Sequence, residues 1–399
     1  MAVRDGMPTV EDFVSEIAEM KLTSNRPLRY VQINSVPNGS TGSVMRSIHE
    51  GLAAKGVDSY LEWGRRGRTS LPYEHNFGTT SEIDPFDAVK SIFDGREGFH
   101  SKASTRRLLK RLDEIDPDVV HLHNLHGYYI NIEMLFDWLL SHRCLVKWTL
   151  HDCWAFTGHC AYFTYARCDQ WKVCCANKKP CPQLRSYPPT LAKSSCEWNF
   201  KKKQQLFRSI PSERMELIAP SAWLADLAKQ SFLSKYRIKV VHNSIDESVF
   251  KPTLSDFRGR HGIPVDRFLI LGVANPWTER KGLSDFIKLS RDLDSSRYVI
   301  VLVGLSLKQI KEIKGNILAL PKTNSKEELA EIYTAADVFF NPTKEDNYPT
   351  VNLEAEACGT SVVTYDTGGC RETVLLHSSA VVSGYEESVE AIKSMASVS

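Results

Sequence analysis

Three carboxylates surround the start of one predicted helix near the end of the chain. Glu345 and Asp346 stand just before this helix, and Glu354 lies one turn inside it. Pro349 precedes the helix, and the backbone N–H groups of a first helical turn have no partners within the helix, so such an end binds phosphate. Carboxylates beside phosphate would repel it, so we expect them to bind hydroxyl groups, such as those of ribose or a sugar. The alternative is an ordinary amphipathic helix whose acids face water.

Two cations and a histidine stand at the ends of other predicted strands. Arg280 and Lys281 come after a predicted strand at 267–275 and before a helix expected from about 282, where a Lys-Gly pair by itself usually marks only the start of the helix. His151 lies near the end of a predicted strand at 144–152, where it is either a functional residue or a structural histidine. Ligands of parallel sheets bind beyond the carboxyl ends of the strands. No nucleophile elbow of a Ser-His-Asp or Cys-His enzyme is recognisable in the sequence. The candidate residues are therefore taken from these strand ends.

Predicted strands and helices alternate along both halves of the chain. This pattern indicates an α/β fold with two Rossmann-like, doubly wound parallel-sheet domains. A short amphipathic helix at 9–21 belongs to an N-terminal extension over 1–26. The first domain is expected at 27–250 and the second at 251–399. Two such domains would face each other across a cleft, which is the natural place for a ligand.

The composition excludes several classes of protein. The chain has 399 residues and a net charge of +2, so its overall charge does not favour nucleic acid as a partner. No run of about 18 apolar residues occurs, so no membrane span is predicted. Acids interrupt the N-terminal segment MAVRDGMPTVEDFVSEIAEMK, which argues against a signal peptide. We therefore expect a cytoplasmic protein with reduced thiols.

The segment KEDNYPTVNLEAEACGTSVVTYDTGGCRE, at 344–372, resembles the donor-site motif of glycosyltransferase family 4, whose members have the GT-B fold. In that motif two acids are separated by seven residues, and E-A-x-A-C-G and G-G-x-x-E follow. Counting back from Glu354 places Asp346 at the first acid position, where the family has Glu, while Glu345 lies one residue too early. The resemblance leaves open which of these two acts, and it implies that Asp346 contacts the donor sugar and Glu354 the ribose. The residues implied to bind the donor at the start of the helix are Pro349, Thr350 and Val351.

Other segments extend the resemblance over most of the chain. NPWTERKG resembles the diphosphate-binding segment of the family, and Lys281 matches its lysine. Asn275 stands where the family has Arg, and Arg280 is expected to supply the missing charge. NGSTGS resembles the family's glycine loop, in which Gly42 would bring backbone N–H groups near the phosphates or the acceptor. WTLHD resembles the family's first-domain histidine motif, so His151 is expected to face the donor sugar.

The resemblance implies a retaining glycosyltransferase of the hexosyltransferase type, which moves a sugar from a UDP- or GDP-sugar to a hydroxyl group. Family 4 enzymes need no catalytic metal, and their favoured mechanism is a front-face displacement in which the leaving diphosphate takes the proton of the acceptor. The implied acceptor is a glycan or a lipid-linked saccharide in the assembly of bacterial surface polysaccharide. Two alternatives stay open: a nucleotide-sugar epimerase of GT-B fold, and a catalytically silent nucleotide-sugar-binding assembly protein. The departures at Asp346 and Asn275 would fit the silent protein.

Six of the ten cysteines fall between Cys153 and Cys181, and none of the six forms a C-x-x-C pair. HDCWAFTGHC and PCPQL resemble a subgroup of family 4 with a cysteine-rich insert after the His-Asp motif, here at 153–182. We hypothesise a structural zinc ion in this insert, and the alternative is a set of reduced, packed cysteines without metal. The expected zinc ligands are Cys160, Cys168, Cys181 and one of Cys174 and Cys175.

Two basic stretches lie in the first domain, which is the acceptor side of this fold. They are RRLLKR at 106–111 and KKK at 201–203. Either could rest on anionic lipid, which would suit a lipid-linked acceptor, and the alternative for each is a solvated helix face. The predicted partners are therefore the donor, the acceptor and, by peripheral contact, an anionic membrane.

Overall fold

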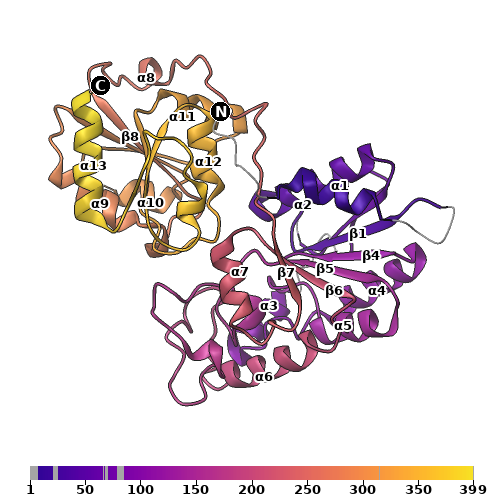
Figure 1. The fold of residues 1–399 in the computed structure, drawn as a ribbon. Coiled ribbons are helices and arrows are strands. Elements are labelled where there is room, and N and C mark those ends of the chain that lie inside the picture. The colour runs from indigo at the N-terminus through magenta and orange to yellow at the C-terminus, as the bar shows by residue number, and fades with distance from the viewer. Residues whose placement is uncertain are drawn as a thin grey trace. The chain divides into compact units, whose positions relative to one another are not determined.

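The computed structural model describes residues 8–20, 26–65, 67, 71–78, 85–313 and 315–398. The chain forms two compact units, and the change from one to the other falls between Asn243 and Ser244 (Figure 1). Each unit has a parallel sheet of its own. None of the described helices is both long and apolar enough to cross a membrane.

The N-terminal unit contains a sheet of seven described strands, each parallel to its neighbours. The strands are β1 (Arg29–Asn34), β2 (Asp58–Trp63), β3 (Glu74–Asn76), β4 (Val119–Leu122), β5 (Leu145–Thr149), β6 (Met215–Ala219) and β7 (Arg237–Val240). Their spatial order is β3-β2-β1-β4-β5-β6-β7, so the strand order changes direction between β1 and β4. Ligands of doubly wound sheets bind beyond the carboxyl ends of the strands at such a change.

Helices accompany this sheet because its central strands are apolar and need cover on both faces. The strand VVHL of β4 is buried at every position, as is MELIA of β6. The helices of the unit are α1 (Val10–Ala18), α2 (Gly39–Ala54), α3 (Pro85–Asp94), α4 (Lys102–Ile115), α5 (Ile132–Ser141), α6 (Ser195–Phe207) and α7 (Ala222–Lys229).

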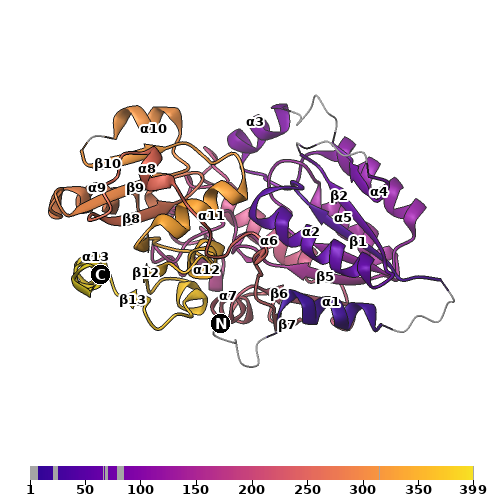
Figure 2. The same ribbon diagram turned by 90° about the horizontal axis from the view of Figure 1, so that it is seen from above.

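Helix α1 corresponds to the helix predicted at 9–21, and it begins with a capping box between Thr9 and Asp12. It was expected in an extension before the first domain, but it is part of the N-terminal unit. Its buried residues Phe13 and Ile17 share one apolar cluster with Ile48 of α2, and α1 lies against α2 (Figure 2). Apolar burial on this scale holds a helix to its domain. Residues 1–7 and 21–25 of the expected extension lie outside the described residues.

The C-terminal unit contains a sheet of six described strands, again parallel throughout. The strands are β8 (Phe268–Val273), β9 (Tyr298–Val303), β10 (Ile317–Leu320), β11 (Val338–Asn341), β12 (Ser361–Tyr365) and β13 (Ala380–Val382). The helices are α8 (Phe257–Arg260), α9 (Leu283–Asp292), α10 (Leu307–Glu312), α11 (Lys326–Ala335), α12 (Thr350–Ala357) and α13 (Tyr385–Val398). The order β10-β9-β8-β11-β12-β13 changes direction between β8 and β11, which marks the expected ligand site of this unit.

The boundary between the units lies earlier than the expected position after Phe250. Phe250 is buried in the apolar core of the C-terminal unit with Leu269, and its ring contacts that of Tyr333 at a centroid distance of 6.2 Å. Residues 244–250, which were expected at the end of the first domain, therefore belong to the C-terminal unit.

Candidate functional site

Lys281 and Asp346 meet at the change of strand order in the C-terminal unit. Lys281 ends a 3₁₀ turn, Glu279–Lys281, in the connection that follows β8, and Asp346 lies in the loop that follows β11. The Nζ atom of Lys281 donates to Oδ2 of Asp346, and Nη1 of Arg280 lies 3.9 Å from the same oxygen. Two sequence motifs that are 65 positions apart thus form one charged group.

The charges of this group favour ionised Asp346. Burial opposes ionisation, but the cations of Lys281 and Arg280 outweigh it and hold the pKa of this carboxyl below its ordinary value. Two positive charges face one negative charge, so the group keeps a net positive charge in a partly buried place. Such a place suits an anion of high charge, such as a diphosphate.

The loop that carries Asp346 is tied to its surroundings by backbone groups. Nη1 of Arg280 donates to the carbonyl of Glu345, and the amide of Lys344 donates to the carbonyl of Arg280 at 2.7 Å. The side chain of Glu345 is fully buried, whereas that of Asp346 keeps 15% of its surface exposed. Of the two acids that the sequence left open, Asp346 places its carboxylate against Lys281 and Arg280.

The start of α12 supplies the second part of this site. Pro349 is the residue before the helix and provides no side-chain cap, while Thr350 and Val351 form its first turn. A helix start without a side-chain cap has backbone N–H groups to offer to phosphate. Glu354 accepts a 3.1 Å hydrogen bond from the hydroxyl of Tyr333, and burial raises the pKa of Glu354.

Asn275 departs most clearly from the expected site. It is exposed in the connection just beyond β8, at the position where the resemblance led us to expect an arginine. Arg280 contacts the loop of Asp346 instead, by way of the Glu345 carbonyl. The expectation that Arg280 compensates for Asn275 stays a prediction.

Gly368→Ala is expected to destabilise the C-terminal unit and to weaken ligand binding at Asp346. Gly368 has a φ of +60°, and a Cβ there would lie 1.9 Å from the carbonyl oxygen of Asp346. The next residue, Gly369, donates its amide to that oxygen at 2.9 Å. Strain and displacement together should cost about 1–3 kcal/mol in the free energy of unfolding, measured by denaturant titration. Gly384→Ala is the control, because no atom lies within 4 Å of a Cβ there. Equal stability of the two variants would show that the turn does not hold Asp346.

His151 of the N-terminal unit is linked to β1 by a chain of hydrogen bonds through His123. The amide of Gln32 donates Nε2–H to the carbonyl of Met45 at 3.0 Å, so its Oε1 is the acceptor for Nε2 of His123 at 3.0 Å. Nδ1 of His123 then accepts from Nε2 of His151, also at 3.0 Å. The chain assigns the proton of His151 to Nε2, so Nδ1 carries no proton and is a hydrogen-bond acceptor.

Burial keeps the histidines of this chain neutral. It lowers the pKa of His151 to about 4 and lowers the pKa of His123 well below its ordinary value. His121 is also buried with a strongly lowered pKa, and it bonds to Tyr30 and Thr149 rather than to His151. His151 therefore acts as a neutral hydrogen-bonding group at ordinary pH. The link to His123 was not expected from the sequence, since it depends on which strands are neighbours.

Asp152, the residue after His151, holds the segment that follows it through hydrogen bonds. Asp152 accepts from the backbone amide of Trp154 at 2.8 Å and bonds to Nε2 of His126 at 2.7 Å. The other ring nitrogen of His126 lies 3.2 Å from the hydroxyl of Tyr187. Asp152, His126 and Tyr187 thus join the carboxyl ends of β4 and β5 to the start of the cysteine-rich insert, at Trp154, and to the segment just after it.

Gly42 lies within the first turns of α2, which begins at Gly39, so the segment expected as a glycine loop is helical. A Cβ at Gly42 would lie 2.4 Å from the backbone carbonyl carbon of Pro37. The glycine therefore allows the connection after β1 to pack closely on α2. Its expected role in presenting N–H groups to a ligand stays a prediction.

The cysteine-rich insert at 153–182 follows β5 and contains two 3₁₀ turns, Trp154–Phe156 and Gln170–Lys172. Its core is aromatic: the ring of Trp171 contacts Phe156 and Phe163 at centroid distances of 5.3 and 5.0 Å. A buried Lys203 donates to the carbonyl of Trp154 at 2.6 Å, so one of the three lysines of the basic stretch at 201–203 is structural. The packing of these side chains explains how the insert keeps a defined conformation.

The expected zinc site is not supported. Among the residues that the structure describes, no group of three or more His, Cys, Asp and Glu side chains is placed so that it could hold a metal ion. Cys181 accepts hydrogen bonds from Cys160 and from Cys196 of α6, which lower its pKa. These thiols border a void of only about 10 Å³, together with Cys168 and Cys175. Cys174, which was one of the expected ligands, does not line the void. Cys196 lines it but was not among the expected ligands, because it lies beyond the insert in the sequence.

Solved structures with the same overall fold confirm the predicted fold class. Sucrose-phosphate synthase from Thermosynechococcus elongatus has a TM-score of 0.66 at 13% identity, covering 93% of this chain and 90% of that one. HepE from Anabaena, in complex with UDP-glucose, has a TM-score of 0.60 at 14% identity, covering 92% of this chain and 89% of that one. The chain has the GT-B fold, with two Rossmann-like units.

Sequence comparisons point to one activity class. Residues 255–397, most of the C-terminal unit, match the model of the protein family Glycosyl transferases group 1. A protein of Escherichia coli K12, named as a colanic acid biosynthesis glycosyl transferase, WcaC, is 25% identical over 359 residues, which cover 86% of this chain and 82% of that one. Together with the fold, these matches support a glycosyltransferase, and the C-terminal unit is similar in sequence to the group 1 family.

Proposed function

We propose that the protein is a retaining hexosyltransferase that moves a sugar from a nucleoside diphosphate sugar to a hydroxyl group of a glycan or lipid-linked saccharide. The observation that carries the proposal is the net positive group of Lys281, Arg280 and Asp346 beside the uncapped start of α12. The name of the E. coli relative supports an acceptor in surface polysaccharide assembly, and bound UDP-glucose in HepE supports a UDP-sugar as donor. A GDP-sugar is the alternative donor.

Each group has a defined task in this proposal. Lys281 and Arg280 neutralise the charge that develops on the diphosphate as its bond to the sugar breaks. Glu354 accepts hydrogen bonds from the ribose hydroxyls, and its raised pKa reflects how little water shields it. His151, neutral and with Nδ1 as acceptor, receives a hydrogen bond from a sugar hydroxyl. The acceptor hydroxyl oxygen bonds to the anomeric carbon on the face that the diphosphate leaves as its bond to that carbon breaks, and the leaving diphosphate oxygen takes the hydroxyl proton. Attack on this face retains the anomeric configuration.

Asp346 has two tasks that follow one another. Without donor it neutralises Lys281, as the ion pair of this structure does. When a diphosphate arrives, the ammonium group turns to the phosphate oxygens, and the carboxylate becomes available to a hydroxyl of the donor sugar. No metal ion is needed for these steps.

The proposal is tested by donor binding. We expect UDP or GDP to raise the thermal stability of the protein, because a ligand at about 100 times its dissociation constant adds about 2.7 kcal/mol to the free energy of unfolding. Inorganic phosphate at the same concentration is the control and should have a much smaller effect. Absence of any shift with UDP, GDP, ADP or CMP would contradict the proposal.

Product analysis then separates transfer from its alternatives. We expect the sugar of the preferred donor to appear on an acceptor, and nucleoside diphosphate to accumulate with it. An epimerase would change the sugar without an acceptor, and a silent binding protein would bind the donor without releasing any product. We further propose that the enzyme acts in the cytoplasm on acceptors held at a membrane.

A further inference from the structure

Helix α3 of the N-terminal unit presents its apolar residues to solvent. Phe86, Val89 and Phe93 are 69%, 48% and 67% exposed, although their spacing puts them on one side of the helix. The polar residues Asp87 and Ser91 are buried on another side. A surface helix of a globular protein ordinarily has the reverse arrangement.

Hydrogen bonds fix this unusual orientation. Oδ2 of Asp87 accepts from the backbone amide of Ser101 at 2.8 Å and from its hydroxyl at 3.0 Å, at the start of α4. At the other end of α3, the carbonyl of Ile92 accepts from the amide of Leu191 at 2.7 Å. Leu191 is itself 66% exposed, so it extends the apolar surface beyond the helix. The exposed apolar side therefore cannot turn inward without losing bonds to a buried carboxylate.

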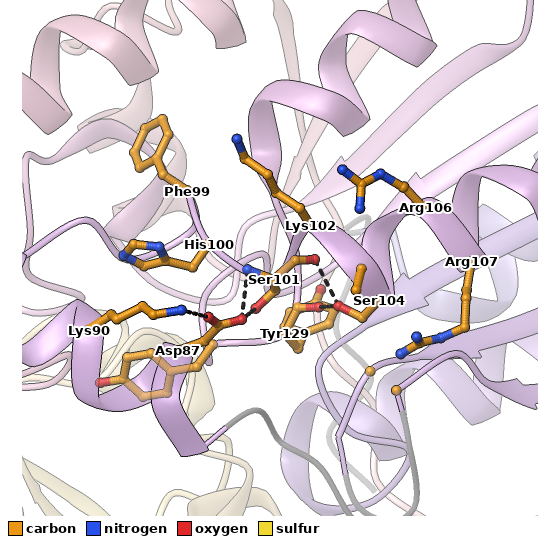
Figure 3. A pocket seen from close by; sticks show the side chains of 14 residues that line it. Asp87, Lys90, Phe99, His100, Ser101, Lys102, Ser104, Arg106, Arg107 and Tyr129 are labelled. Carbon is orange, nitrogen blue, oxygen red and sulfur yellow. Dashed lines mark hydrogen bonds and ion pairs between the residues drawn. The ribbon is translucent and has the colours of Figure 1, made fainter.

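A cationic pocket adjoins this surface. It has a volume of about 440 Å³ and lies between α3, the start of α4 and the segment around Tyr128 and Tyr129 (Figure 3). Among the described residues that line it, one is an acid, Asp87, and four are Lys or Arg: Lys90, Lys102, Arg106 and Arg107. Lys90 belongs to α3 itself, and its Nζ lies 3.4 Å from Asp87, so the pocket begins where the apolar surface ends.

We propose that the apolar side of α3 and the four cations of this pocket form a docking surface for an anionic lipid bilayer. The apolar side chains would enter the boundary between headgroups and acyl chains, and the cations would contact the lipid phosphates. A protein partner is disfavoured because a stable interface buries about 800 Å² on each side, more than a few side chains of one helix provide. The combination of an apolar stripe with adjacent cations is what an anionic membrane surface complements.

The purpose of this surface rests on the proposed function, because docking would bring the enzyme to a lipid-linked acceptor. Whether the docking surface exists does not depend on the proposed function, since vesicle binding can be measured without donor or acceptor. Loss of donor binding would leave the docking result unchanged, and absence of docking would leave the donor result unchanged.

The test is sedimentation of the full chain with lipid vesicles. We expect the protein to sediment with vesicles of phosphatidylcholine and phosphatidylglycerol and to stay in solution with phosphatidylcholine alone. Binding should weaken when the salt concentration rises from about 0.1 M to about 1 M, because the Debye length falls from about 10 Å to about 3 Å. Failure to bind either kind of vesicle would overturn the proposal.

Two double variants identify the surface. Val89→Ser with Phe93→Ser, and Lys102→Glu with Arg106→Glu, should each lower the partition onto phosphatidylglycerol vesicles by at least about tenfold. The matched controls are Leu307→Ser, at a side chain 75% exposed, and Lys308→Glu, both on α10 of the other unit, and they should bind like the wild type. Because the changed residues are exposed, the melting temperatures should stay close to that of the wild type. Equal loss in the controls, or a dimer in solution that the Val89 and Phe93 changes dissociate, would overturn the proposal.

Discussion

Replacing Lys281 by alanine is expected to lower the rate of sugar transfer by about 100- to 1000-fold, the usual cost of removing one group that stabilises transition-state charge. The ammonium group of Lys281 lies at the change of strand order, where it contacts Asp346 in the absence of ligand. Without it the leaving diphosphate faces Asp346 with Arg280 as the remaining cation of the group. Initial rates at saturating donor measure the loss, and the thermal shift caused by nucleoside diphosphate should fall in parallel.

A neighbouring lysine provides the control for this substitution. Lys344 is on the same loop as Asp346, but it is paired with Glu279 near the surface. Lys344→Ala removes the same charge from the same region and should change the rate by less than about threefold. If both variants lost activity equally, the loss would reflect the general positive potential of the region rather than contact with the diphosphate.

Removal of Lys281 also leaves a buried carboxylate with weaker compensation, which could lower stability by itself. The double variant Lys281→Ala with Asp346→Asn separates this effect from catalysis, because it removes both charges. We expect the double variant to regain the stability of the wild type and to stay inactive. Recovery of activity in the double variant would show that Lys281 serves only to neutralise Asp346.

The sequence allowed the candidate residues of the C-terminal unit to be placed at one edge of the sheet, because each lies in the connection after a predicted strand. Lys281 follows β8 and Asp346 follows β11, and parallel strands bring their carboxyl ends to one edge of a sheet. The ion pair between them could not be predicted, because it requires β8 and β11 to be neighbours. The same limit applies to His123, whose bond to His151 depends on β4 lying between β1 and β5.

Two other features lay beyond sequence analysis for different reasons. Cys196 reaches Cys181 from α6, and nothing in the spacing of the insert indicates a thiol so far downstream. The apolar spacing in α3 would by itself predict a buried helix face. The hydrogen bonds from Ser101 to Asp87 instead turn the polar side of α3 inward. A buried carboxylate without hydrogen bonds costs more free energy than a phenylalanine side chain exposed to water.

Replacing His151 by alanine is expected to lower the transfer rate by about a hundredfold, because a positioned hydrogen-bonding group is lost from the reaction. His123→Leu should lower it by about tenfold while leaving donor binding intact, since the proton of His151 would no longer be assigned to Nε2. His121→Gln is the control: His121 lies on β4, two residues before His123, and bonds to Tyr30 and Thr149, so the change should lower stability without changing the rate per folded molecule. A rate unchanged in His151→Ala would remove this histidine from the mechanism.

The acid dependence of the protein gives an independent check on His151. Its pKa in the folded protein is lowered to about 4, against an ordinary value of about 6.5 in the unfolded chain. Between these values the unfolded chain binds more protons than the folded protein, so the free energy of unfolding falls as the pH falls from about 6.5 towards 4. His151→Ala should reduce this slope, measured by denaturant titration at several pH values. The transfer rate, in contrast, should show no step near pH 6.5 from His151, because the folded protein keeps it neutral there. A step at that pH that disappears in the variant would place a protonated His151 in the reaction and would reverse the proton assignment made from Gln32 and His123.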